Sequence, residues 1–129
     1  FRIALGVYSI FLSTIGTLAY IGRLPGILVI VPHHDTLGHV VLIGTFSLLL
    51  DGSLRFRPLP VLNWWPVGLG PVLVLVAAGA EELLQALSAN RSSTLSDFVA
   101  DLAGIFFFAL LARILTWRKR REVRQRAAL

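Results

Sequence analysis

Four long apolar segments, separated by short polar connectors, constrain the fold of this chain more than any other feature. They cover about residues 3–21, 36–54, 67–88 and 95–117. A helix needs roughly 20 apolar residues to cross a bilayer, so each segment is long enough to span one. Only 15% of the 129 residues are charged, whereas soluble domains carry about 25%. The sequence therefore predicts an all-α, four-helix transmembrane bundle that forms a single domain over residues 1–117.

Basic residues predict which ends of the segments face the cytoplasm. Arg55 and Arg57 lie between the second and third segments, and six more basic residues crowd the stretch 118–129. The connectors on the other side hold only Arg23 and Arg91. Because basic residues concentrate on the cytoplasmic side of membrane proteins, we expect both termini in the cytoplasm, with 118–129 as a basic cytoplasmic tail.

Composition also narrows the classes of function and partner. The chain has no cysteine, which excludes disulfides, thiolate metal sites and cysteine nucleophiles. It has no phosphate-binding loop, nucleophile motif or base-reading module, so we expect no cofactor and no nucleic-acid partner. A basic tail directly after an apolar segment is typical of contact with anionic headgroups, so membrane lipids are the expected partners.

Polar and ionisable side chains gather at the non-cytoplasmic ends of the predicted spans. The candidate site residues are His39, Glu82, Gln85, Arg91, Asp97 and Asp101, with Asp35 and Glu81 as lesser candidates. A charged side chain inside hydrocarbon costs at least about 2.5–3.5 kcal/mol on insertion scales. The carboxylates should therefore point inward and be paired, protonated or hydrated. We predict that these residues form one polar cluster, which either binds a ligand or holds the bundle together.

Helical spacing places several of these residues on common faces. Gln85 can share a face with either of the two glutamates that precede it, and Asp97 and Asp101 are four residues apart. Gly104, one turn deeper, would let a neighbouring helix approach closely. A capping box with Thr94 explains Asp97 on its own, whereas Asp101 has no such structural reason to be there.

A metal site is the weaker interpretation of the same cluster. His39 with Glu82, Asp97 and Asp101 would supply nitrogen and oxygen ligands. The sequence has no closely spaced histidine or cysteine pattern that is typical of metal sites, so we predict no metal. Crowded carboxylates can also form an acid–base pair, but no catalytic residue can be assigned, and whether the protein is an enzyme stays open.

Two more charged residues lie near the cytoplasmic ends of the segments. We expect the second helix to continue through Asp51 toward Phe56, with its polar residues reaching the headgroups. Arg113 lies one turn inside the fourth segment and can extend to the cytoplasmic face. Both side chains should therefore meet the headgroup region.

The ordered motifs resemble those of the VanZ-like family of small bacterial membrane proteins. They are Asp35-x-x-x-His39, Glu82-x-x-Gln85, Arg91 with Thr94, and Asp97-x-x-x-Asp101-x-x-Gly104, and they cover about residues 35–104. Asp101 stands where the family has an asparagine, and Ala89-Asn90 replaces its usual Pro-Gly. The resemblance implies a multi-pass protein of the bacterial cytoplasmic (inner) membrane, in a family with a member linked to teicoplanin resistance.

Two functions are compatible with these features. The first is an outward-facing polar pocket that binds or handles a polar envelope molecule or a lipid headgroup. The alternative is an accessory structural subunit of a larger membrane complex, in which the polar cluster stabilises the bundle. Small residues on one face of the first segment would then contact other membrane protein subunits. That face comprises Gly6, Ser9, Ser13, Gly16 and Thr17.

Overall fold

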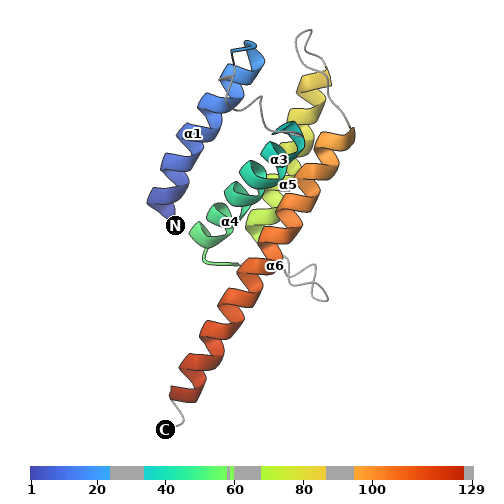
Figure 1. Cartoon of the computed structure of the whole chain (residues 1–129). Coiled ribbons are helices and arrows are strands. Elements are labelled where there is room, and N and C mark those ends of the chain that lie inside the picture. Colours follow the sequence, from blue (N-terminus) through green and yellow to red (C-terminus); the bar gives the residue numbers. More distant parts are fainter. Residues whose placement is uncertain (24–33, 58, 60–67, 87–94, 127–129) are drawn as a thin grey trace.

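Four helical rods make up the part of the chain that the structure describes (Figure 1). The computed structural model describes residues 1–23, 34–57, 59, 68–86 and 95–126, with the backbone only for 34, 35, 86, 115 and 117–126. The elements are α1 (Arg2–Tyr20), α3 (His34–Gly38), the π-helix η1 (His39–Ile43), α4 (Gly44–Ser53), α5 (Leu69–Ala86) and α6 (Leu95–Arg126). Because α3, η1 and α4 follow one another without a break, they form one rod. The prediction of an all-α, four-helix architecture is confirmed.

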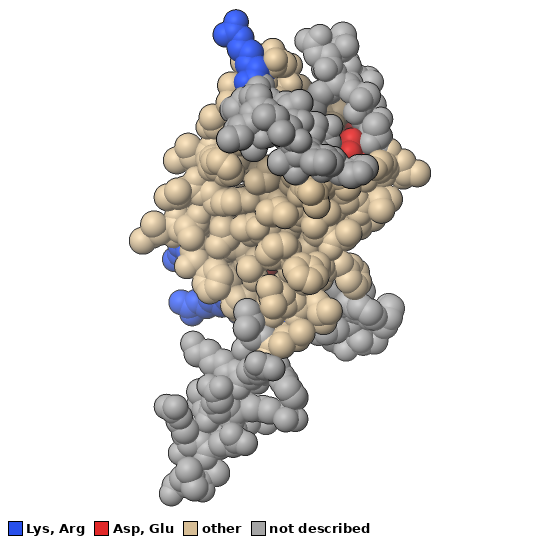
Figure 2. Space-filling view, in the orientation of Figure 1, with Lys and Arg blue, Asp and Glu red and all other residues tan. Residues whose placement is uncertain are grey.

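Three of these rods are long and apolar enough to cross a membrane. Within the described residues, the qualifying stretches are Arg2–Tyr20, Thr36–Ser53 and Leu95–Ile114. Helix α5 has 18 residues, which at 1.5 Å per residue gives about 27 Å. Figure 2 shows the middle of one face formed almost entirely by uncharged residues, with arginine side chains toward its ends and an acidic side chain near the top. The protein is therefore a membrane protein.

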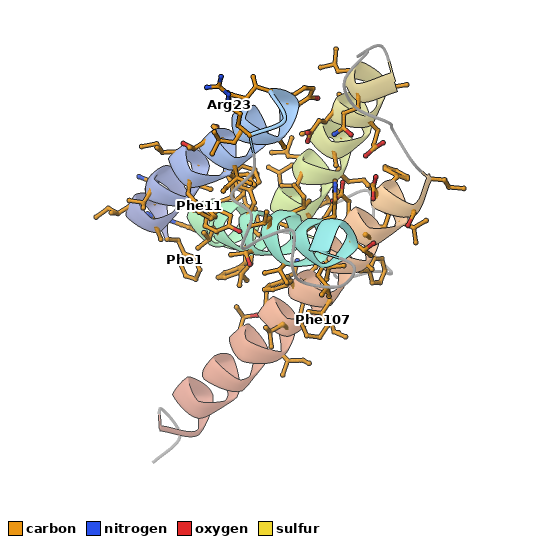
Figure 3. All side chains as sticks on the ribbon, turned by 45° about the horizontal axis from the view of Figure 1, so that its top comes forward. Phe1, Phe11, Arg23 and Phe107 are labelled. Carbon is orange, nitrogen blue, oxygen red and sulfur yellow. The ribbon has the colours of Figure 1, made fainter. Side chains whose placement is uncertain are left out.

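The interior of the bundle consists of small apolar side chains and polar ones. The buried apolar residues are Val74, Ala78, Ala100, Ile105 and Ala112, and the largest fully buried side chains are Gln85, Asp51 and Ser47. Large apolar side chains lie on the outside, as Phe107 does in Figure 3. Small interior residues allow close helix contact, and apolar outer side chains match lipid tails.

Helix α6 and the η1–α4 part of the second rod touch backbone to backbone. A Cβ atom added to Gly44 would lie 2.8 Å from the carbonyl oxygen of Gly104. A Cβ added to Gly104 would in turn meet the carbonyl oxygen of Val40 and lie 2.9 Å from its Cα. Only glycine fits at such a contact. The close approach that the sequence predicts at Gly104 is thus present, and we refer to it as the glycine contact.

Helix α1 packs mainly against α4 and has no buried residue. The Tyr8 hydroxyl donates to the carbonyl oxygen of Leu42 at 3.1 Å, and the Phe1 ring meets Phe56 edge to face at 5.6 Å. The hydroxyls of Ser9, Thr14 and Thr17 each donate to the carbonyl oxygen four residues earlier in the helix. These hydroxyls can therefore face lipid without an unsatisfied donor.

Candidate functional site

A hydrogen bond between two ionisable side chains joins the second rod to α6. The Nδ1 atom of His39 lies 2.9 Å from Oδ1 of Asp101, and these side chains are 14% and 3% exposed. An ionised carboxylate only accepts hydrogen bonds, so Nδ1 carries the proton when Asp101 is charged. Asp101 is six residues beyond Leu95, the first residue of its span, or about 9 Å along the helix. The pair thus lies within the membrane-spanning part of the bundle.

The glycine contact explains why this distance is short. His39 is the first residue of η1 and directly precedes Val40, whose backbone touches Gly104. Asp101 lies one turn before Gly104 on the same side of α6. The backbone contact therefore fixes the separation of the two rods at the level of the pair. π-Helical turns of this kind frequently occur at functional sites.

Helix α5 contributes a buried amide to the same end of the bundle. Gln85 is 1% exposed, and its Nε2 donates to Oε1 of Glu81 at 3.0 Å. Pro71, Val74 and Ala78 are also buried, and their spacing from Gln85 defines one inward face of α5. Figure 3 shows oxygen-bearing side chains on the facing sides of the last turns of α5 and the first turns of α6.

The predicted site residues divide into three groups. His39 with Asp101, and Gln85 with Glu81, are brought into direct contact. Glu82 and Asp97 are partly exposed at this end of α5 and α6. Asp35 is described only by its backbone in α3, and Arg91 lies outside the described residues, as does the capping residue Thr94. We use the term polar end for His39, Glu81, Glu82, Gln85, Asp97 and Asp101.

The polar end does not bring metal ligands together in the described part of the chain. There, no group of three or more His, Cys, Asp or Glu side chains is arranged to hold a metal ion. The chemistry that these residues offer is hydrogen bonding to hydroxyl and ammonium groups, and proton exchange at an imidazole. A catalytic role cannot be assigned to any of them.

A second buried carboxylate, Asp51, lies at the opposite end of the bundle. Asp51 is 2% exposed, and the backbone N–H of Gly70 donates to its Oδ1 at 3.2 Å. A Cβ added to Gly70 would lie 2.5 Å from the Asp51 Cα, so the first turn of α5 closes over the carboxylate. The expectation that Asp51 reaches the headgroups is therefore wrong.

Arg113 lies near this second cluster. Its positive charge acts on the Asp51 carboxylate, and its Nη2 is buried without a hydrogen-bond partner among the described residues. Ser47, one turn before Asp51, is also fully buried, and its Oγ has no partner there either. The Arg113 side chain as a whole is half-buried, so its extension to the cytoplasmic face stays a prediction. We call Ser47, Asp51 and Arg113 the inner cluster.

Comparison with known proteins identifies no relative of this chain. No protein-family profile, curated protein or solved structure matches the chain. The resemblance of its motifs to the VanZ-like family therefore stays a prediction from the residues. The His39–Asp101 bond brings one residue from each of two sequence motifs into contact, Asp35-x-x-x-His39 and Asp97-x-x-x-Asp101.

Proposed function

We propose that this is a multi-pass protein of the bacterial cytoplasmic membrane whose polar end binds or handles a polar envelope molecule or a lipid headgroup. The observation that carries this proposal is the 2.9 Å bond between His39 and Asp101 inside the spans. Ionisable groups at this depth are costly and are typically found where they serve a site. The VanZ-like motifs, which include both residues, support the same role in envelope function.

The chemistry of the polar end favours a ligand with ammonium or hydroxyl groups. Carboxylates of Glu81, Glu82, Asp97 and Asp101 accept hydrogen bonds and attract cations. The imidazole of His39 hydrogen-bonds Asp101, so it orients that carboxylate. Arg91, by prediction from the sequence, meets an anionic group of the same ligand.

Removing charge while keeping shape tests the role of the polar end. We expect Glu82→Gln and Asp101→Asn to reduce binding of envelope lipids and any effect on teicoplanin susceptibility, with little change in thermal unfolding. Asp51→Asn is the matched control, because it removes a buried carboxylate at the opposite end. Unchanged binding in both polar-end variants would refute the proposal. If stability falls together with binding, the cluster is structural and the alternative function is favoured.

The proposed orientation is outward for the polar end and cytoplasmic for both termini. The basic stretch that ends α6 lies at the opposite end of that helix from Asp101, and the positive-inside rule assigns that side to the cytoplasm. The absence of cysteine makes labelling direct. A thiol at the exposed position of Ser96→Cys should react from outside, and Arg57→Cys only after the membrane is opened. The reverse pattern would invert the assignment.

A second candidate function, an accessory subunit of a larger membrane complex, is favoured by α1. This helix buries no residue, and nothing lies within 4 Å of a Cβ added to Gly6 or Gly16. Small residues of this kind let another helix approach closely. Disulfide cross-linking through Ser13→Cys tests this role: a specific cross-linked product in native membranes supports it, and reaction with lipid-soluble reagents alone contradicts it.

A further inference from the structure

A groove runs along the outside of the bundle beside the His39–Asp101 pair. It lies between α3–η1 and α6 and has a volume of about 460 Å³. Thr36 and Val40 form one wall, and Leu95, Ser96, Val99, Ala100 and Ala103 form the other. Val99 and Ala103 are exposed, so the groove opens sideways to the surroundings of the helices, which in a membrane are lipid chains.

The groove is mainly apolar along its length. Its two hydroxyl-bearing residues, Thr36 and Ser96, lie near the start of their helical rods, together with the apolar Leu95. Deeper in the span the lining is formed by Val40, Ala100 and Ala103, with aliphatic side chains only. The wall from Ser96 to Ala103 is about 10 Å long at 1.5 Å per residue. An apolar groove of this length, open to the lipid, suits a segment of a hydrocarbon chain.

The groove lies at the same level as the polar end. Val40 directly follows His39, and Ala100 directly precedes Asp101, so the groove and the His39–Asp101 pair lie on neighbouring faces of the same two rods. Ser96, at the mouth, adjoins Asp97. A molecule with its chain in the groove therefore carries its head to the level of the acidic residues.

We propose that one whole lipid binds here, with an acyl chain in the groove and an ammonium-bearing headgroup at the polar end. This inference rests on the proposed function and names its ligand class. Charge complementarity selects the headgroup, because carboxylates dominate the described residues of the polar end. A zwitterionic aminolipid such as phosphatidylethanolamine meets this requirement, whereas an anionic lipid without an amine does not.

Native mass spectrometry of the full chain tests this inference. The protein is released from micelles that hold equal amounts of phosphatidylethanolamine and phosphatidylglycerol with identical acyl chains. We expect retained phosphatidylethanolamine to exceed phosphatidylglycerol by roughly tenfold, a factor that corresponds to about 1.4 kcal/mol. Equal retention of the two lipids would mean non-selective boundary lipid only and would overturn the inference.

Two alanine variants test the place of the chain. Ala103→Leu fills the groove at an exposed position, without entering the core, and should lower retention of phosphatidylethanolamine several-fold. Ala77→Leu is the matched control, because Ala77 is also exposed but lies on α5, away from the groove. Loss of retention in both variants, or in neither, would overturn the placement of the chain in this groove.

The outcome also separates this inference from the proposed function. If Asp101→Asn and Glu82→Gln reduce retention while Ala103→Leu does not, the polar end still binds a headgroup and only the groove assignment fails. If Ala103→Leu alone reduces retention, the chain is held in the groove, but selection of the head by the carboxylates fails and the proposed function fails with it.

Discussion

The glycine contact gives the most direct prediction, because Gly104→Ala adds a single methyl group against backbone atoms. The new Cβ would lie 2.9 Å from the Val40 Cα, whereas carbon atoms pack at about 3.5–4.0 Å. No side-chain rotation relieves this overlap, so the two rods must separate. Overpacking of this kind costs up to about 3 kcal/mol, and alanine recovers about 1 kcal/mol of helix propensity. We expect a net loss of about 2 kcal/mol.

The matched control is Gly16→Ala in α1, where nothing lies within 4 Å of the added Cβ. That variant should be neutral or more stable by up to about 1 kcal/mol. Thermal unfolding of the two purified variants in one detergent measures the difference, which should reach roughly 10 °C. Gly104→Ala should also weaken ligand retention, since it displaces His39 from Asp101. Equal unfolding temperatures for the two variants would refute the backbone contact.

Three further substitutions have expected outcomes that thermal unfolding can measure. Asp101→Leu should lower the free energy of unfolding by about 1 kcal/mol, because it removes the acceptor of the His39–Asp101 hydrogen bond. Asp101→Asn should lower it less, since an amide oxygen still accepts, and equal losses would contradict this. Asp51→Ala should lower the free energy of unfolding by about 2–3 kcal/mol. Adding Arg113→Met to the same chain should restore part of this loss. If the effects of the two substitutions simply add, the two side chains are not coupled. Tyr8→Phe should cost about 0.6 kcal/mol, and no change would mean that its hydroxyl bond does not hold α1.

The helices were accessible from the sequence, whereas the specific contact within the polar end was not. Runs of apolar residues reveal membrane helices because the bilayer requires a fixed length of them. The sequence placed His39 and Asp101 at the same predicted depth and Gly104 one turn deeper, but it did not single out these two residues as partners. Their hydrogen bond is a finding of the structure, and a single cluster of all the candidate residues stays a prediction.

The inner cluster was not predicted, because the sequence allowed a simpler explanation for the position of each of its charged residues. Asp51 and Arg113 each lie near a predicted membrane boundary, where a charged side chain can reach the headgroups at little cost. Asp51 is buried because the first turn of α5 closes over it, and this packing of two separate helices is not visible in a local sequence pattern. The sequence feature that could have indicated a close contact here is the pair Gly68 and Gly70, since a Cβ at either position would collide with Asp51.

The positions of the two clusters indicate what the polar end is able to do. His39 and Asp101 lie on one side of the glycine contact, and the inner cluster lies on the other side along both rods. At the contact, Gly44 and Gly104 leave no room for even a methyl group, so no water-filled path passes between these two rods within the described residues. A ligand at the proposed site therefore does not pass between these two rods, and reaches the polar end by another route.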